Sequence, residues 1–129
     1  MSANESNEME KVKVVNGLFR DPNLEIWHEK DYKYNAPHHF RVMENTEDMY
    51  GQIASINFQE GPIKEVGVNG LTNEVLLMMV LTRLQAFQNS EYSTRDNAIA
   101  ITHIEDALLR LNKRTDDRVA RGVEGFNKI

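Results

Sequence analysis

An almost wholly apolar stretch in the middle of the chain limits the folds open to this protein. Between residues 75 and 87 most positions are apolar on every side of the helix that they predict, and Asn73 is placed to cap it. The stretch is shorter than the roughly 18 residues that span a bilayer, so we expect no membrane segment. One side of such a helix can pack within the chain. In a protein of 129 residues we expect a second copy to cover the remainder, making a homo-oligomer.

A second helix follows. Ser93, with Asp96 three positions later, has the pattern of a capping box and predicts a helix start. Four apolar residues then recur with the 3, 4, 3 spacing of a seam between packed helices: Ile101, Ile104, Leu108 and Leu111. We expect this helix to run to about Val119, with Gly122 and Gly125 ending it. The C-terminal half is therefore predicted to be an antiparallel helical pair.

The N-terminal half carries patterns of short strands. Residues 11–14 alternate briefly, and two clearer alternations at residues 40–42 and 54–58 predict an antiparallel hairpin, with 44–48 as its polar connection. Residues 24–35 are rich in aromatic side chains but have no clean period. Residues 59–70 hold three glycines and a proline and predict a structured loop. The fold class is therefore α+β, with a small antiparallel sheet ahead of the helical pair.

Composition narrows the class of protein further. We divide the chain into a polar, partly disordered tail at 1–23 and a single α+β domain at 24–129. The net charge of −5 argues against a binder of nucleic-acid polymers or membrane surfaces. The absence of cysteine excludes disulfides, thiolate metal sites and cysteine nucleophiles. The N-terminus has no signal-peptide pattern, so we expect a soluble, cytoplasmic protein.

A row of arginines on the second helix is the most informative chemical feature. Arg110, Arg114, Arg118 and Arg121 share roughly one helix face, where like charges repel unless something offsets them. The row has two interpretations. One is a solvated face neutralised by nearby acids, namely Glu105, Asp106, Asp116 and Asp117. The other is an anion site, since the guanidinium fork donates paired hydrogen bonds to phosphate.

Three further residues have a functional and a structural interpretation. Phe87 ends the first helix and Asn97 lies in the first turn of the second, so the hairpin brings them near each other. They suit stacking on a base and a polar contact to a base or sugar, but also core packing and an ordinary helix start. Lys64 lies in the glycine loop, which matches no common phosphate-binding motif yet can form an anion nest.

The histidines and carboxylates do not indicate catalysis. His38 and His39 are adjacent on a predicted strand and therefore point to opposite faces, which argues against a shared metal ion. No pattern separates a general acid from a general base, and no nucleophile lies in a recognisable constellation. We expect no catalytic residue, no metal site and no cofactor.

Long segments of the chain also resemble a known family. They are YNAPHHF at 34–40, INFQEGPIKEVGVNGLTNEVLL at 56–77, RLQAFQNSEYSTRDNAIAITHIEDAL at 83–108 and LNKRTDDRVARGVEG at 111–125. On these strings the chain closely resembles the Thoeris anti-defence family of phage proteins, which is related to the shorter anti-CBASS sponges. The resemblance extends over roughly residues 26 to 126.

The resemblance implies a sponge, which binds a cyclic nucleotide immune signal without cleaving it. Such proteins combine a small antiparallel sheet with a helical pair and assemble as dimers or hexamers in the host bacterial cytoplasm. The Thoeris signal is a glycosyl-cyclic ADP-ribose made by a TIR-domain enzyme, and binding it prevents activation of the host defence effector. Some members also bind cyclic di- or trinucleotides in separate pockets.

The resemblance also implies roles for particular residues. Phe87 would stack on the purine, Asn97 would make a polar contact, and Arg114 and Arg118 would bind the pyrophosphate, with a neighbouring chain as one source of these arginines. Lys64 and its glycine loop are the candidate for the second pocket. Three alternatives stay open: a helical oligomer that docks an acidic partner protein, an enzyme that hydrolyses the signal, and a minor DNA-binding role.

Overall fold

The computed structural model describes residues 10–45 and 51–129. These residues form two compact units, which we describe separately. The first holds the strands and runs to Gly61 with residues 68–70 added, and the second holds the helices in residues 62–67 and 71–129. Residues 1–9 of the predicted tail and residues 46–48 of the predicted polar connection lie outside the described residues. The predicted domain boundary at residue 24 stays a prediction.

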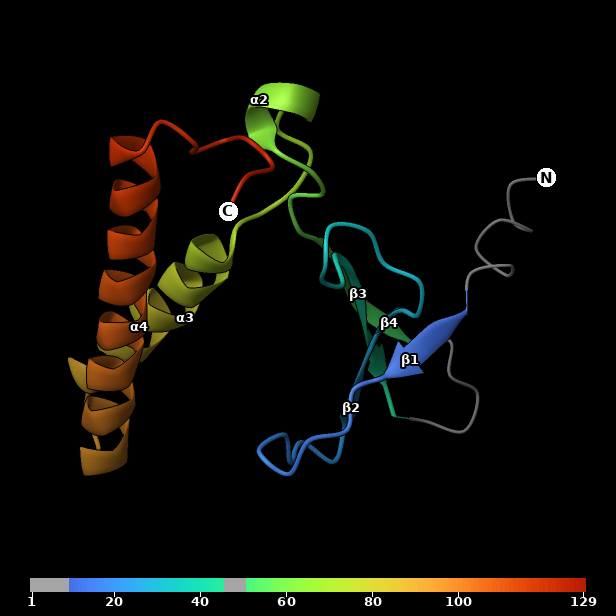
Figure 1. Ribbon diagram of the computed structural model, residues 1–129. Helices are drawn as coiled ribbons and strands as arrows, with labels where there is room; N and C mark the ends of the chain where they lie inside the picture. Colours follow the sequence, from blue (N-terminus) through green and yellow to red (C-terminus); the bar gives the residue numbers. More distant parts are fainter. Residues whose placement is uncertain (1–9, 46–50) are drawn as a thin grey trace. The chain divides into compact units, whose positions relative to one another are not determined.

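The first unit is a four-stranded sheet in which each strand pairs antiparallel with the next along the chain (Figure 1). The strands are β1 (Lys11–Lys13), β2 (Leu24–Glu29), β3 (His39–Glu44) and β4 (Gln52–Asn57). This confirms the predicted antiparallel sheet and its hairpin. The brief alternation at residues 11–14, which could have been a strand or only the approach to one, is the short strand β1. The sequence patterns missed β2, because Trp27 and His28 invert the usual apolar-in, polar-out alternation.

The two faces of this sheet differ in chemistry. Residues opposite one another across antiparallel strands share a face. On one face Phe40 pairs with His28 and Ile56, and its ring lies 5.5 Å from the Phe58 ring. On the other face Trp27 pairs with Arg41, which pairs with Ser55. The buried side chains of this unit include three polar ones, Glu25, Glu29 and His38. The sheet therefore carries a polar face with titratable groups beside an apolar one.

The second unit is built from α2 (Ile63–Val66), α3 (Asn73–Gln88) and α4 (Arg95–Ala120), of which α3 and α4 pack together as predicted (Figure 1). The single turn α2 lies within residues 59–70, which we predicted as a loop. The buried apolar side chains of the described residues are Leu81 and Leu108, one from each long helix. Leu108 belongs to the predicted seam, so the period of α4 identified its packing face.

The helix ends correct two predictions by one residue each. Thr72, not Asn73, caps α3 by accepting a hydrogen bond from the Val75 N–H at 3.3 Å. Thr94, not Ser93, caps α4 by accepting from the Asn97 N–H at 3.0 Å. Threonine, serine and asparagine all cap well, so composition does not decide between neighbours. The predicted end of α4 near Val119 is confirmed to within one residue.

Much of the apolar surface of α3 is exposed within one chain. The side chains concerned are 42 to 54% exposed: Val75, Met78, Met79 and Val80. Among the described residues no helix combines the length and the apolar character that crossing a membrane requires. That a second copy of the chain covers the exposed apolar side chains of α3 stays a prediction.

Candidate functional site

Phe87 and Asn97 lie at the same end of the helical hairpin. The Gln88 side chain closes this turn, because its amide donates to the Thr94 carbonyl at 2.9 Å and its oxygen accepts from the Thr94 N–H at 3.1 Å. Phe87 is 40% exposed, and the Arg83 guanidinium carbon lies 5.1 Å from its ring centroid. The ring is thus outside the buried core of its own chain. Sequence reasoning missed Arg83, although its spacing of four from Phe87 is the signal of a helix-surface contact.

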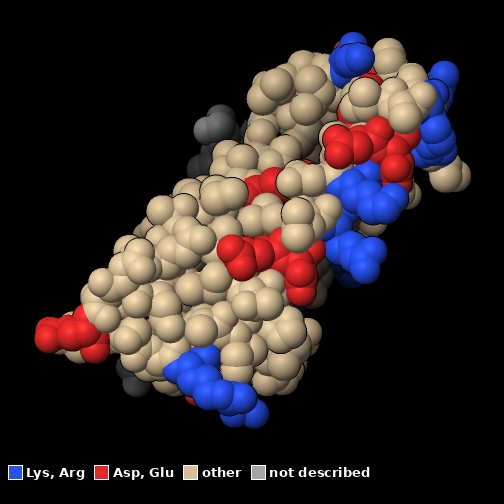
Figure 2. Space-filling model, turned by 90° about the vertical axis from the view of Figure 1, so that its left-hand side faces the viewer, with Lys and Arg blue, Asp and Glu red and all other residues tan. Residues whose placement is uncertain are grey.

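Arg114 is exposed on α4, and the interactions found among the described residues assign it no hydrogen bond or ion pair. One of the acids named for the solvated-face interpretation, Asp117, pairs with Lys113 at 3.1 Å. Figure 2 shows one face of the protein, on which basic and acidic side chains lie next to one another. Arg114 is therefore a charged donor available to a ligand.

Arg118 is engaged in its own chain. Its side chain is 12% exposed, and its Nε lies 3.4 Å from the Glu124 carboxylate. Its two terminal nitrogens donate to three backbone carbonyls of the segment that follows α4: Val123 at 2.9 Å, Phe126 at 2.8 Å and Lys128 at 2.6 Å. A guanidinium has five N–H donors, so these contacts use most of its capacity. Its predicted role toward a pyrophosphate stays a prediction and would require some of these contacts to be exchanged.

Lys64 contacts the same C-terminal segment from α2. Its N–H donates to the Gly125 carbonyl at 3.1 Å, and its Nζ lies 5.4 Å from the Phe126 ring centroid. Next to it, the Glu65 carboxylate accepts from the Asn127 N–H at 3.1 Å. The structure therefore brings Lys64 and Arg118 to residues 123–128 and places Phe87 and Asn97 at the turn of the hairpin.

Along α4, the predicted ligand residue Arg114 lies far from Asn97 at the turn of the hairpin. Asn97 and Arg114 are 17 positions apart (114 − 97) on one continuous helix. At a rise of 1.5 Å per residue this separation is about 25 Å, longer than a single nucleotide-sized ligand. The predicted set therefore cannot surround one such ligand within a single chain.

The polar face of the sheet carries a cavity of about 300 Å³ that sequence reasoning did not find. Its lining includes the two cations Lys11 and Arg41, the Trp27 ring and the polar side chains Glu29, His39 and Asn57. Burial lowers the pKa of Lys11, and the nearby Arg41 charge lowers it further. None of the predicted site residues lines this cavity. Its residues come from four strands, so no single segment of sequence signals it.

The His39 ring beside this cavity has a polar partner at each of its nitrogens. Its Nδ1 lies 2.9 Å from the Asn57 side-chain oxygen, and its Nε2 lies 3.3 Å from the Glu60 carboxylate. The hydrogen bond with Asn57 is the main cause that raises the pKa of His39 above its usual 6.5, with Glu60 and Glu29 adding to it while burial opposes them. Adjacent His38 faces elsewhere, with its Nε2 2.6 Å from the Lys33 carbonyl.

Comparison with known proteins identifies the family of the helical hairpin. Residues 52–116 match the family model described as the Acb2/Tad1 hairpin domain, a range that contains all of α3 and most of α4. The chain is also 45% identical to Thoeris anti-defense 1 of Bacillus phage SBSphiJ7, in a match that covers 82% of this chain and 91% of that protein. The chain therefore belongs to the phage Thoeris anti-defence family, as the sequence resemblance implied.

Proposed function

We propose that this protein is a sponge that binds TIR-derived glycosyl-cyclic ADP-ribose and sequesters it uncleaved, which prevents activation of the host defence effector. A Thoeris anti-defence role follows from the family, and the 45% identity to Thoeris anti-defense 1 is the observation that carries the proposal. The finer statement about the ligand is supported by the chemistry of the predicted residues. We place this activity in the host bacterial cytoplasm.

The predicted residues are binding groups. The Arg114 guanidinium is exposed and can donate paired hydrogen bonds to a pyrophosphate. The Phe87 ring offers a partly exposed aromatic surface, and the Asn97 carboxamide offers one donor group and one acceptor. None of these three side chains can act as a general base at neutral pH. This chemistry supports holding the signal intact.

We propose that a complete site takes Phe87 and Asn97 from one copy of the chain and Arg114 from another. The separation of about 25 Å along α4 requires this if all three contact one ligand. The exposed apolar side chains of α3 provide a surface for the association. Assembly as a dimer or a hexamer is compatible with this arrangement. Lys64 and the glycine loop remain the candidate for a separate cyclic di- or trinucleotide pocket.

The required affinity also favours a shared site. A sponge must bind the signal more tightly than the effector does, and nanomolar affinity corresponds to about −12 kcal/mol. One charge-assisted hydrogen bond contributes about 1.5–3 kcal/mol net. Arginine contacts alone therefore fall short, and stacking together with burial between two copies must supply the rest.

Calorimetric titration with glycosyl-cyclic ADP-ribose tests the proposal, followed by heat denaturation and chromatography of the released ligand. We expect tight binding and intact recovery. Arg114→Ala and Asn97→Ala should each weaken binding by about tenfold to a hundredfold or more, the loss of one charge-assisted or polar contact. Arg110→Ala and Asn112→Ala are the matched controls on exposed positions of α4. Unchanged affinity in both site variants would contradict the site assignment.

A second candidate is a helical oligomer that docks an acidic partner protein, and the exposed side chains of Arg110 and Arg114 on α4 are the observation that favours it. A thermal-shift series with cyclic nucleotides separates the two, because a docking protein should not respond to them. Recovery of a cleaved product in the chromatography would instead support the enzyme alternative.

A further inference from the structure

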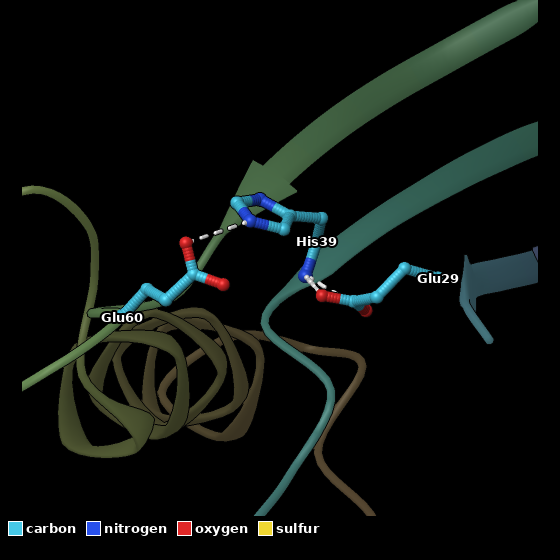
Figure 3. A group of neighbouring side chains, drawn as sticks. All are labelled: Glu29, His39 and Glu60. Carbon is cyan, nitrogen blue, oxygen red and sulfur yellow. Dashed lines mark hydrogen bonds and ion pairs between the residues drawn. The ribbon is translucent and has the colours of Figure 1, made fainter. Parts of the chain in front are cut away.

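We propose that Glu29, His39 and Glu60 form a binding site for a divalent transition-metal ion, for which Zn²⁺ is the probe. The three residues come from β2, from β3 and from the segment after β4. One ligand atom of each lies within 4.8 Å of the others. Figure 3 shows the His39 ring directed toward Glu60, with the Glu29 carboxylate against the His39 backbone nitrogen. The site is independent of the proposed sponge function, since it uses none of the predicted ligand residues.

The orientation of His39 suits a metal ligand. Because the Asn57 side-chain oxygen can only accept, the 2.9 Å contact assigns the proton to Nδ1. In the neutral ring Nε2 then carries a lone pair and points toward the Glu60 carboxylate at 3.3 Å. Two acceptors facing each other need a proton or a cation between them. Metal-binding histidines have this arrangement, in which the other ring nitrogen donates to a fixed acceptor.

Backbone N–H groups of β3 and of the residue before it hold the Glu29 carboxylate in place. The residue is only 4% exposed. Its carboxylate accepts the His38 N–H at 3.0 and 3.2 Å and the His39 N–H at 3.2 Å to both oxygens. Only two N–H donors are involved, each shared between the two oxygens, whereas an ionised carboxylate offers about four lone-pair sites, so it can take a further partner. A buried, preoriented carboxylate of this kind loses little entropy when it binds a cation.

Glu60 is positioned by the loop that follows β4. Its N–H donates to the Asn69 side-chain oxygen at 2.8 Å, and the Asn69 amide donates to the Glu60 carbonyl at 2.7 Å. The Asn69 N–H in turn donates to the Gln59 side chain at 2.9 Å. These bonds fix the backbone at residue 60, while its carboxylate remains 29% exposed and able to turn.

The charge and spacing of the group define its ligand. With a metal ion in place of a proton on Nε2, the two carboxylates and the neutral imidazole carry two negative charges, and within the described residues Glu29 makes no ion pair with a lysine or arginine. Lys11 and Arg41 line the same cavity as Glu29 and His39 and offset part of this charge. Zinc with ligands at about 2.1 Å holds them about 3.4 Å apart, so Glu60 and His39 need only small movements. An imidazole ligand favours a transition metal over Mg²⁺ or Ca²⁺. Three protein ligands leave a fourth position for water or an anion.

This proposal replaces the sequence-based expectation of no metal site. That expectation concerned His38 and His39 as a pair, and the two rings do point to different partners. The carboxylates lie 10 positions before and 21 positions after His39 (39 − 29 and 60 − 39). No metal motif has this spacing, so only the pairing of β2, β3 and β4 brings the three together.

The test is calorimetric titration of the untagged, chelator-treated full chain with ZnCl₂. We expect one equivalent to bind to the original protein. His39→Gln and Glu60→Gln should each weaken binding by at least about tenfold, and Asn57→Ala by about tenfold through the orientation of His39. The matched controls are His103→Gln and Glu44→Gln, which alter exposed residues outside the group and should leave binding unchanged. Circular dichroism checks that each variant folds.

A second readout does not depend on the variants. Nitrogen NMR of the histidine rings should show the His39 Nε2 signal shift on addition of Zn²⁺, with Mg²⁺ causing no such shift. The proposal is overturned if the original protein binds no Zn²⁺ at micromolar concentrations. It is also overturned if His39→Gln leaves binding unchanged, if the control variants lose as much as the site variants, or if the shifted ring belongs to another histidine.

Discussion

The two units of this protein bury opposite kinds of side chain. In the sheet unit the most buried side chains are polar and hydrogen-bonded, namely Glu25, Glu29 and His38, whereas the helical unit buries Leu81 and Leu108. Polar burial is specific in geometry and responds to pH, because each buried charge depends on its partners. Apolar burial is non-directional and grows with the area covered. The sheet is therefore suited to a defined polar site, and the helices to association through the apolar surface that one chain leaves exposed.

The strongest test of this difference is Leu108→Ala. Truncating a buried leucine removes its transfer free energy and leaves a cavity, so we expect a loss of about 2–4 kcal/mol in the free energy of unfolding. Leu108 is 8% exposed, while the adjacent Leu109 is 65% exposed and serves as the matched control. Urea unfolding followed by circular dichroism measures both. Equal losses in the two variants would show that α4 packs on a different face.

Arg118→Ala tests a cluster of polar contacts in the helical unit. The side chain is 12% exposed and donates to three carbonyls and one carboxylate of residues 123–128. We expect a loss of about 2 kcal/mol, because the freed carbonyls regain water only in part. Arg114→Ala, which removes no such contact, should change stability by less than about 0.5 kcal/mol.

Hydrogen exchange of residues 123–128 gives the matching local measurement. Faster exchange confined to this segment in Arg118→Ala would show that the Arg118 hydrogen bonds hold the segment in place. Unchanged exchange there would contradict it. Comparing the same two variants in the ligand titration then separates a role in binding from a role in holding the segment.

The smallest expected effect is the pH response of Glu25 in the sheet unit. Its hydrogen bond with Lys13 is the main cause that lowers the pKa of Glu25 below 4.5, and the 3.3 Å bond from the Trp27 indole nitrogen adds to it. A lowered pKa means that the ionised carboxylate contributes stability above pH 4.5, which is lost as the pH falls through the folded-state value. Glu25→Gln should remove this part of the acid dependence.

Trp27 provides the measurement, since it is the only tryptophan of the chain. Its fluorescence during unfolding at several pH values below neutrality should show a flatter acid dependence in Glu25→Gln. Lys13→Met removes the partner at 2.9 Å and should flatten the same part of the profile. An acid slope that persists in both variants would show that other carboxylates of the sheet govern it.

Much of the fold could be predicted because it depends on local periodicity. The alternation at residues 40–42 and 54–58 identified β3 and β4, and the apolar spacing of α4 identified the face that buries Leu108. The strand β2 was not predicted because Trp27 lies on the polar face of the sheet and His28 on the apolar face, against the usual alternation. The turn α2 escaped because four residues are too few to show a helical period.

Less of the candidate site could be predicted. The proximity of Phe87 to Asn97 follows from the hairpin, and the availability of Arg114 follows from its position on an exposed face. The engagement of Arg118 does not follow, because its partners are backbone carbonyls, which every residue has. The cavity on the sheet could not be predicted from the sequence either, because its lining residues come from four strands.

The amino-acid order alone specified the α+β class, the helical hairpin and the family, because these depend on patterns within contiguous segments. The three-dimensional arrangement was needed to show that Arg118 is engaged in its own chain, which side chains hold residues 123–128, and that Glu29, His39 and Glu60 meet. Contacts of this kind join residues far apart in the chain through strand register and side-chain rotamers. Neither is encoded in the period of a single segment, so only the folded chain reveals them.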